Sequence, residues 1–449
     1  MESYYDLLII GGVAAGMSAA SQARRENKQM SIALFEKSDF VSYGSCGMPY
    51  YIGGIISDYN KLIAIDVDKF INKRNIQIMT GTEATAIDFK GKKVTAVQKG
   101  EEVEVSYGKL MIATGAKAIH PPIPGADQEG VFVLRNLNDG IKIKKYVDEK
   151  KPKSVVLVGG GFIGLELAEN FRGNNIEATI VERLESVAMG MDVEIRDRII
   201  QRLENNGVTV KTGTTVKEIK KDGSRIAVDA GGELIAADLV VLSVGIAPNT
   251  DFLKGSELEM TEKGAITVNE KSETNMPDVY SGGDCATVKH LVTGKNVYMP
   301  LGPTANKQGR VAGLQAAGVT TERFLGIVGT QLVKVFDLEV GKTGLSDDEA
   351  EAEGIPAISE GNTWKSRAGY CPKGDRLFVK LTINPDTREI IGGQIAGTDG
   401  AAQRTNVIAT AIASKMKVED FAYLDLGYAP PFSPVWDALL VTAQKMVKR

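Results

Sequence analysis

The sequence predicts an α/β fold in which two similar units of parallel β-sheet and helix occur in one chain. A short apolar run at 7–10, of the kind that forms a buried parallel strand, leads into a Gly-rich turn and a helix of small residues. The same order returns roughly 150 residues later, from an apolar strand at 155–158. In each unit a second apolar strand ends in an acid, Glu36 in the first and Glu182 in the second.

The first turn reads Gly11, Gly12, Val13, Ala14, Ala15, Gly16, which resembles the pattern G-x-G-x-x-G with Val13 in place of the second glycine. The first glycine permits the tight turn, and the last lets the helix pack against the strand. The N-terminus of that helix offers N–H groups to a pyrophosphate. Glu36, at the end of the strand 32–35, is placed to accept a hydrogen bond from a ribose hydroxyl.

The second turn reads Gly159, Gly160, Gly161, Phe162, Ile163, Gly164, and the strand 178–181 that follows it ends at Glu182. Two such patterns predict two Rossmann-like units and two dinucleotides in one chain. A carboxylate at Glu182 pairs with a ribose diol and repels a 2′-phosphate, which favours NADH over NADPH. Arg183, directly after it, works against that preference.

Two more strands end in small residues and are expected to mark the crossings between the two units. One leads into Ala113, Thr114 and Gly115, and the other reaches Gly245 and Pro248. A third apolar strand near 279–281 leads to Asp284. A Gly-Asp pair of this kind is usually a turn or a helix cap, but its offset from the other motifs favours a carboxylate that accepts a hydrogen bond from a ribitol hydroxyl.

Cys46 is the candidate redox residue, because it follows the first nucleotide unit directly. The positions five before and five after it are Val41 and Tyr51, so the chain has no local cysteine with which it could form a disulfide. An oxidised Cys46 must then be a mixed disulfide with a small thiol, a sulfenate or a persulfide. The alternative, outside this context, is a small buried apolar residue.

Composition narrows the function classes further. The 449 residues are 43% hydrophobic and 24% charged with a net charge of -4, which provides no basic surface for nucleic acid or an anionic membrane. Three scattered cysteines and two histidines predict neither a disulfide framework nor a metal site. The start of the chain is acidic, and no apolar run approaches the ~20 residues of a membrane span. We expect a cytoplasmic protein.

Taken together, these motifs resemble the pyridine nucleotide-disulfide oxidoreductase family over residues 5–445, and the lone Cys46 is similar to its single-cysteine branch. That branch contains coenzyme A-disulfide reductase, water-forming NADH oxidase and NADH peroxidase. The resemblance implies an FAD domain interrupted by an NAD(P)H domain, then an α+β C-terminal dimerisation domain and a homodimer. The expected bounds are 1–115 and 246–325 for the two parts of the FAD domain, 116–245 for the NAD(P)H domain, and 326–449 for the dimerisation domain.

The resemblance also implies which residues contact the nucleotides. They are Gly11, Val13, Ala14, Ala15, Gly16, Glu36, Lys37, Ser42, Ala113, Thr114, Gly115 and Asp284 for FAD, and Gly159, Gly161, Phe162, Ile163, Gly164, Glu166, Glu182 and Gly245 for NAD(P)H. Phe162 is expected to act as a movable aromatic lid. The N–H groups around 47–50 are expected to stabilise a Cys46 thiolate.

Within the branch, the residues favour coenzyme A-disulfide reductase. The oxidase and peroxidase carry a histidine in the first turn where this chain has Ala14. Gln22 and Arg25 match coenzyme A contacts of the family, and Ser42 and Ser45 flank the cysteine in the same run, so all four are expected to bind substrate. Arginine also suits a phosphate through bidentate bonds.

Tyr370 and Tyr428 match two tyrosines that the reductases bring across the dimer interface, and no histidine follows His290 to act as the acid instead. The predicted function is NAD(P)H-dependent reduction of coenzyme A disulfide or a related small disulfide, persulfide or polysulfide. The first alternative is an NADH oxidase that reduces oxygen through a Cys46 sulfenate. Electron transfer to a protein acceptor such as a rubredoxin, and a flavin-bound sensor, remain further alternatives.

Overall fold

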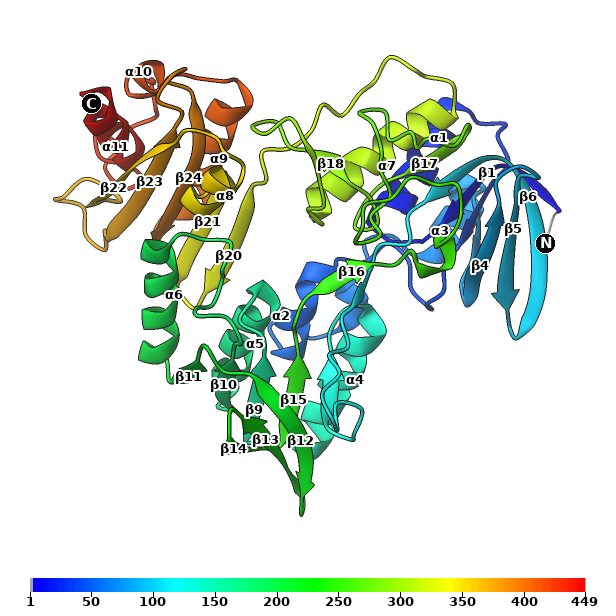
Figure 1. Ribbon diagram of the computed structural model, residues 1–449, viewed down its shortest axis with the longest axis horizontal. Coiled ribbons are helices and arrows are strands. Elements are labelled where there is room, and N and C mark those ends of the chain that lie inside the picture. Colours follow the sequence, from blue (N-terminus) through cyan, green and yellow to red (C-terminus); the bar gives the residue numbers. More distant parts are fainter. Residues whose placement is uncertain (1–2, 449) are drawn as a thin grey trace.

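The computed structural model describes residues 3–448, and its N-terminal and middle segments together form a seven-stranded sheet (Figure 1). The strand order is β3-β2-β1-β6-β5-β4, and β17 pairs with β6. The bounds are β1 Tyr4–Ile10, β2 Ile32–Phe35, β3 Gln77–Met79, β4 Thr82–Asp88, β5 Lys93–Gln98, β6 Glu101–Ile112 and β17 Val279–Ser281. Strands β1, β2, β3, β6 and β17 run parallel, whereas β4 and β5 form an antiparallel extension.

Two helices pack backbone to backbone beside this sheet. Helix α1 (Ala14–Glu26) lies against α7 (Gly302–Ala316), which comes nearly 300 residues later in the chain. A Cβ atom on Gly309 would lie 2.1 Å from the Ala15 carbonyl oxygen, and one on Gly313 would lie 2.4 Å from that of Ala19. Only glycine at these two positions permits the contact. The shorter helices α2 (Met48–Ile52) and α3 (Val67–Arg74) complete this part.

A second, fully parallel sheet of five strands has the order β11-β10-β9-β15-β8. The bounds are β8 Val131–Val133, β9 Ser154–Val158, β10 Glu177–Val181, β11 Val208–Lys211 and β15 Leu239–Leu242, with helices α4 Leu137–Lys150, α5 Phe162–Gly173 and α6 Val193–Asn205. Strands β12 Val216–Asp222, β13 Arg225–Ala230 and β14 Glu233–Ala237 form a separate antiparallel sheet. Burial of all five residues of β9 accounts for its continuous apolar sequence.

The chain enters and leaves this second unit through one pair of antiparallel strands. These are β7 (Ala116–Ala118) and β16 (Ile246–Pro248), where Ala116 faces Pro248. The unit is therefore an insertion between two segments of the first one. The return segment carries the short strands β18 (Val288–Lys289) and β19 (Asn296–Val297) before α7.

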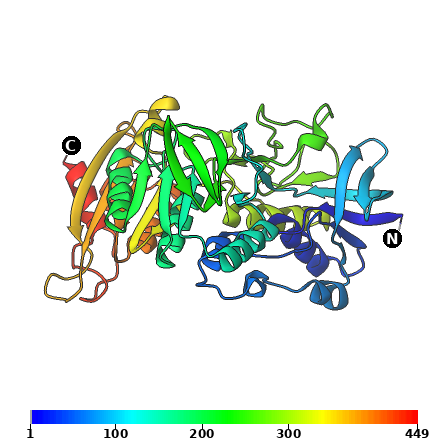
Figure 2. The ribbon, with the colours of Figure 1, turned by 90° about the horizontal axis from the view of Figure 1, so that it is seen from below.

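The C-terminal part is an antiparallel sheet of five strands covered by helices (Figure 2). The order is β20-β21-β24-β23-β22, with β20 Gln331–Val335, β21 Leu338–Gly344, β22 Ile358–Lys365, β23 Arg376–Ile383 and β24 Ile390–Gly397. The helices are α8 Asp347–Ala352, α9 Ala401–Ala413, α10 Val418–Phe421 and α11 Ala438–Val447.

The predicted fold class is confirmed: two Rossmann-like units are followed by an α+β C-terminal part. The expected helix after the first turn is present and runs from Ala14 to Glu26. No helix within residues 3–448 is both long and apolar enough to cross a bilayer.

Strand β23 is buried on both faces, since every residue after Arg376 is buried. Lys380 is among them, and it lies where the sheet meets the start of α6. Its ammonium is 2.7 Å from Asp347, 3.0 Å from Asp192 and 3.2 Å from Glu194. Burial alone would lower the pKa of Lys380, but the bonds to Asp347 and Asp192 outweigh burial and raise it.

Replacing Lys380 with Met should therefore destabilise the protein, because it leaves the buried carboxylate of Asp192 without its cation. We expect a loss of about 3–5 kcal/mol in the free energy of unfolding, measured by urea titration near pH 8. The loss should shrink toward pH 5, since burial already raises the pKa of Asp192 and a neutral carboxyl needs no cation. The exposed Lys365→Met is the control and should change stability by less than about 0.5 kcal/mol. Equal stability of the two variants would contradict the structural role of Lys380.

Candidate active site

The first Gly-rich turn forms a close backbone cradle. Gly11 has a φ of +105°, and a Cβ atom there would lie 2.0 Å from the carbonyl oxygen of Ala113 on the neighbouring strand. A Cβ atom on Gly16 would lie 1.9 Å from the oxygen of Gly11. No side chain caps the N-terminus of α1 at Val13, so its first N–H groups have no capping partner. This surface fits a pyrophosphate.

The second turn repeats this geometry. Gly159 has a φ of +114°, and a Cβ atom there would lie 2.4 Å from the Ser243 oxygen. A Cβ atom on Gly164 would lie 2.2 Å from the Gly159 oxygen. Gly161, the uncapped N-cap residue of α5, has open space where its Cβ would be. Phe162 and Ile163 begin the helix, and both are half-buried.

The two acids are held identically relative to their turns. Oε2 of Glu36 accepts the N–H of Gly12 at 2.7 Å, and Oε2 of Glu182 accepts that of Gly160 at 2.7 Å. In each case Oε1 accepts an N–H group two residues further along the chain. The carboxylates are thereby fixed beside the turns. This repeated arrangement fits two dinucleotides, one per unit.

The loop with the cysteine is hydrogen-bonded to the first turn. Ser42, with a φ of +54°, donates its N–H to the oxygen of Gly12 at 2.8 Å and accepts the N–H of Ala64 at 2.7 Å. Cys46 follows in a single 3-10 turn, Ser45–Gly47, which continues into α2. All three cysteines are free, and Cys46 is the exposed one.

The pKa of the Cys46 thiol is raised from its ordinary value, mainly by partial burial and then by the carboxylates of Glu166 and Asp284. Arg135 and the backbone N–H of Cys46 act in the opposite direction and are outweighed. The N–H groups at 47–50 were expected to stabilise a thiolate. That stabilisation stays a prediction, and in the protein by itself burial outweighs the backbone N–H of Cys46.

Arg135 is a site residue that the sequence analysis missed. Its guanidinium donates to the Ala116 oxygen at 2.7 Å and to Oδ2 of Asp284 at 2.8 Å. It thus joins the inserted unit to the proposed ribitol carboxylate. Tyr298 donates to the backbone oxygen of Asp284 at 3.0 Å. The local sequence feature that could have pointed to Arg135 is the capping box at Asn136, which fixes the start of α4 directly after it.

Two arginines meet at the buried amide of Gln22, which is 4% exposed. Its Oε1 accepts hydrogen bonds from Arg25 at 3.1 Å and from Arg310 of α7 at 2.9 Å. Arg24 points elsewhere and donates to the Arg74 oxygen at 2.7 Å. Arg310 was not predicted, since only the packing of α7 on α1 brings it here.

Tyr370 and Tyr428 come together although they are 58 residues apart. Their hydroxyl oxygens are 2.9 Å apart, and both rings are exposed on loops of the C-terminal part. The hydrogen bond to Tyr428 raises the pKa of Tyr370.

The other predicted nucleotide residues lie around the two turns, as follows. Ala14 and Ala15 begin α1, Lys37 pairs with Glu83 at 2.7 Å, Ala113 to Gly115 follow β6, Glu166 lies one turn into α5, and Gly245 has a φ of +114° just before β16.

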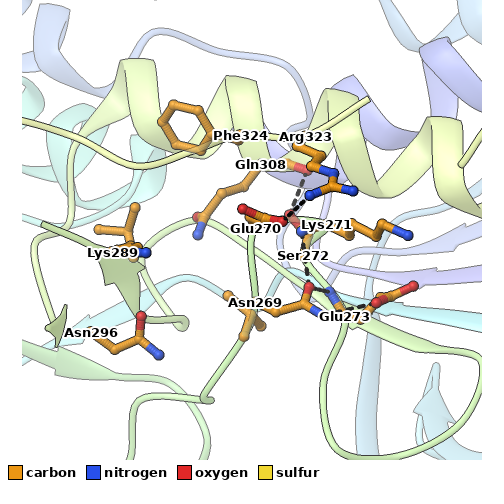
Figure 3. Close-up of a pocket in the computed structure, with 12 residues that line it drawn as sticks. Asn269, Glu270, Lys271, Ser272, Glu273, Lys289, Asn296, Gln308, Arg323 and Phe324 are labelled. Atoms are coloured by element: carbon orange, nitrogen blue, oxygen red, sulfur yellow. Dashed lines mark hydrogen bonds and ion pairs between the residues drawn. The ribbon is translucent and has the colours of Figure 1, made fainter. Parts of the chain in front are cut away.

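A pocket of about 400 Å³ lies apart from these residues, between α7 and the segment 268–273 (Figure 3). None of the predicted site residues lines it. Its wall includes the ion pair of Arg323 with Glu270 at 2.7 Å. Gln308 reaches from it toward the site and accepts the N–H of Gly283 at 2.9 Å, next to Asp284.

These features define an oxidoreductase with two nucleotide-binding units, of the class that uses FAD and NAD(P)H. Family comparison agrees: residues 5–309 match the pyridine nucleotide-disulphide oxidoreductase model, and residues 330–439 match its dimerisation domain. The chain belongs to this family.

Curated relatives span nearly the whole chain. An NAD(P)H sulfur oxidoreductase (CoA-dependent) of Pyrococcus furiosus is 37% identical over 98% of both chains, and an NADH oxidase of Methanocaldococcus jannaschii is 34% identical over 98% of both. A coenzyme A disulfide reductase of Staphylococcus haemolyticus is 29% identical over 95% of this chain and 96% of its own.

Two solved structures have a TM-score of 0.95. Reduced Bacillus anthracis CoADR-RHD is 34% identical and covers 100% of this chain and 81% of its own. An NAD-dependent persulfide reductase from A. fulgidus is 36% identical and covers 98% of this chain and 83% of its own.

The fixed carboxylate of Glu182 should favour NADH, because it repels a 2′-phosphate. In Glu182→Gln the amide oxygen can still accept the Gly160 N–H, so the turn is kept while the charge is lost. We expect the ratio of kcat/KM for NADH over NADPH to fall by about tenfold. The measurement is the rate of flavin reduction with each nucleotide, and an unchanged ratio would show that Arg183 sets the preference instead.

Proposed function

We propose that this flavoprotein uses NAD(P)H to reduce coenzyme A disulfide or a related low-molecular-weight disulfide, persulfide or polysulfide through Cys46. The observation that carries the proposal is the exposed, free Cys46 in a loop hydrogen-bonded to the FAD turn through Ser42. Without a second thiol beside it, Cys46 can pair only with sulfur that is delivered from outside. The names of the relatives in Pyrococcus and Staphylococcus support this substrate class.

The substrate's phosphates are proposed to bind near Gln22. Gln22 holds two guanidinium groups, from Arg25 and Arg310, at one point on the surface formed by α1 and α7. Guanidinium groups bind phosphate through paired, charge-assisted hydrogen bonds. We assign Ser42 and Ser45, which flank the sulfur in the same loop, to the thiol end of the substrate.

In the proposed mechanism, the first Gly-rich turn, Glu36 and Asp284 would hold FAD, which would supply the redox chemistry between NAD(P)H and sulfur. Phe162 covers the nucleotide site until NAD(P)H displaces it, and Glu182 and Glu36 hold the riboses. Deprotonated Cys46 attacks one sulfur of the disulfide, which forms a mixed disulfide and expels one thiolate. A tyrosine hydroxyl at 370 or 428 holds that thiolate as it leaves.

We propose that the tyrosines act from the partner subunit of a homodimer. Tyr370 and Tyr428 are 75% and 47% exposed, on loops that also expose Phe432 and Trp436. An exposed aromatic patch of this kind is typical of a protein interface. The match of residues 330–439 to the dimerisation domain supports a second copy as the partner. We place the homodimer in the cytoplasm, where Cys46 is kept reduced.

Reduction of oxygen to water through a Cys46 sulfenate is the second candidate. The named NADH oxidase of Methanocaldococcus jannaschii favours it. Ala14, in place of the histidine of the oxidase and peroxidase branches, counts against it. Oxygen consumption without thiol release would select this candidate over disulfide reduction.

Replacing Cys46 with Ser should abolish turnover of coenzyme A disulfide and leave FAD reduction by NADH intact. The reason is that hydride transfer precedes the step that needs sulfur. We expect less than a few per cent of wild-type thiol release, measured with a thiol-reactive dye. Cys371→Ser is the matched control and should retain activity. Residual turnover well above that level in Cys46→Ser would sink the thiol mechanism.

The shared-site model can be tested by mixing subunits. Cys46→Ser and the double variant Tyr370→Phe, Tyr428→Phe should each be nearly inactive. A heterodimer of the two contains one complete site, so exchange should restore activity to about half of wild type per dimer. If the heterodimer stays as inactive as its parents, the tyrosines only pack the interface.

A further inference from the structure

Tyr370 and Tyr428 lie on two irregular loops of the C-terminal part. The Tyr370 loop (366–375) connects β22 to β23, and the Tyr428 loop (422–437) connects α10 to α11. The hydroxyl oxygens of the two tyrosines are nevertheless 2.9 Å apart. Loops of this kind keep such a geometry when other parts of the fold hold their backbones in place.

The direct backbone contact between the two loops is modest. Ala368 donates its N–H to the oxygen of Pro430 at 3.2 Å, which is at the long end of the usual range for a hydrogen bond. A stronger connection runs through a side chain of the neighbouring helix α9.

Arg404 of α9 donates to the backbone of both loops from one guanidinium nitrogen. Its Nη2 lies 2.9 Å from the oxygen of Ser366 and 3.2 Å from the oxygen of Phe432. The first acceptor comes four residues before Tyr370, and the second comes four residues after Tyr428. One planar group therefore sets the distance between the two loops.

The guanidinium of Arg404 is itself held on its other sides. Its Nε donates to Oδ2 of Asp437 at 2.9 Å, and its Nη1 donates to the oxygen of Gly400 at 3.2 Å. The Ser433 hydroxyl donates to the same Oδ2 at 2.9 Å, and Asp437 also caps α11 by accepting the N–H of Leu439 at 3.0 Å.

This ion pair is largely shielded from water, since the side chains of Arg404 and Asp437 are 11% and 7% exposed. Charge-assisted hydrogen bonds are strong and directional in such surroundings. A buried ion pair often adds little to stability compared with apolar packing, but it can specify one geometry. Here the geometry that it specifies is that of the two tyrosine loops.

We propose that Arg404 is a positioning residue for the tyrosine pair, which it holds in the arrangement that presents both hydroxyl groups to the sulfur site of the partner subunit. This rests on the proposed function, in which a hydroxyl at 370 or 428 holds the thiolate that leaves. Arg404 contacts neither substrate nor cofactor in this role. It acts through the backbone oxygens of Ser366 and Phe432.

The test places 3-fluorotyrosine at position 370 of the holoenzyme and follows its ionisation by fluorine NMR. The hydrogen bond to Tyr428 raises the pKa of Tyr370, so Tyr428→Phe should move the ionisation to lower pH and calibrate the readout. Arg404→Gln should move it in the same direction and to a similar extent, because the loops separate and the hydroxyl groups lose contact.

Arg404→Lys keeps a positive charge beside the buried carboxylate of Asp437, so this variant tests the proposal even where the glutamine variant does not fold. A single ammonium group does not have the fork of a guanidinium, and it cannot reach Asp437 and both loop oxygens together. We expect the same direction of change in the fluorine titration as in Tyr428→Phe.

Turnover should follow the label. In Arg404→Lys, kcat for thiol release from coenzyme A disulfide should fall at least about tenfold, while reduction of FAD by NADH stays at the wild-type rate. Mixed with Cys46→Ser subunits, Arg404→Lys should recover one active site per heterodimer. Mixed with the Tyr370→Phe, Tyr428→Phe subunits, it should recover none, since both act on the same side of the shared site.

Arg388→Lys is the matched control, because Arg388 also joins a carboxylate and a backbone oxygen in the C-terminal part. It donates to Glu419 of α10 at 2.7 Å and to the oxygen of Met446 of α11 at 3.1 Å. Its acceptors lie on helices rather than on the tyrosine loops. The fluorine titration and kcat of this variant should both match the wild type.

A fluorine titration of Arg404→Lys identical to the wild type would overturn the proposal, whatever the turnover. A shifted titration with wild-type kcat also defeats it, because the loops would then move without any effect on the reaction. If the wild type releases no thiol from coenzyme A disulfide, the proposed function fails by itself. A shifted titration would in that case still support Arg404 as the residue that holds the two tyrosines together.

Discussion

The backbone contact between α1 and α7 is the constraint on which the nucleotide site depends. Gly309 and Gly313 let the two helices approach until the carbonyl groups of Ala15 and Ala19 leave no room for a side chain. Helix α1 begins at the Gly-rich turn, and Gly11 in that turn packs directly against the backbone of Ala113. One contact therefore fixes where the helix N-terminus points.

The contact between α1 and α7 also brings Arg25 and Arg310 together at Gln22, near the other end of α1. Gln22 follows Ala19 by one turn, and Arg310 follows Gly309 directly, so the packing that excludes side chains at 309 brings Arg310 to the amide of Gln22. The cradle for one nucleotide and the proposed phosphate contact for the substrate are thus two ends of one rigid helix. A shift of α7 would disturb both.

The sequence predicts the parts of the site that depend on local order along the chain. Strand, turn, helix and acid follow one another within about 30 residues, so both units could be predicted directly from the sequence, as could the single thiol. Arg135, Arg310 and the contact of Tyr370 with Tyr428 could not, because distant segments bring them together. The burial of Lys380 could not be predicted either, because two of the carboxylates that compensate its charge, Asp192 and Glu194, lie nearly 190 positions earlier.

The direction in which the pKa of Cys46 shifts could not be predicted from the sequence either. From the sequence, the N–H groups next to Cys46 are the visible influence, and they favour a thiolate. In the folded chain, burial and the carboxylates of Glu166 and Asp284 outweigh them. Both carboxylates come from other segments, so the sign of the shift is a tertiary property.

Burial raises the pKa of two carboxyl groups, Asp192 and Glu166, and the two differ in whether a cation lies beside them. Asp192 lies 3.0 Å from the ammonium of Lys380, so its charge is compensated and it holds two parts of the chain together. Glu166 has no such cation within 3–448, and burial and the charge of Glu169 raise its pKa to about 7. A buried carboxyl group without a nearby cation keeps its proton to a higher pH than usual, whereas one paired with a lysine stays charged and serves as a structural ion pair.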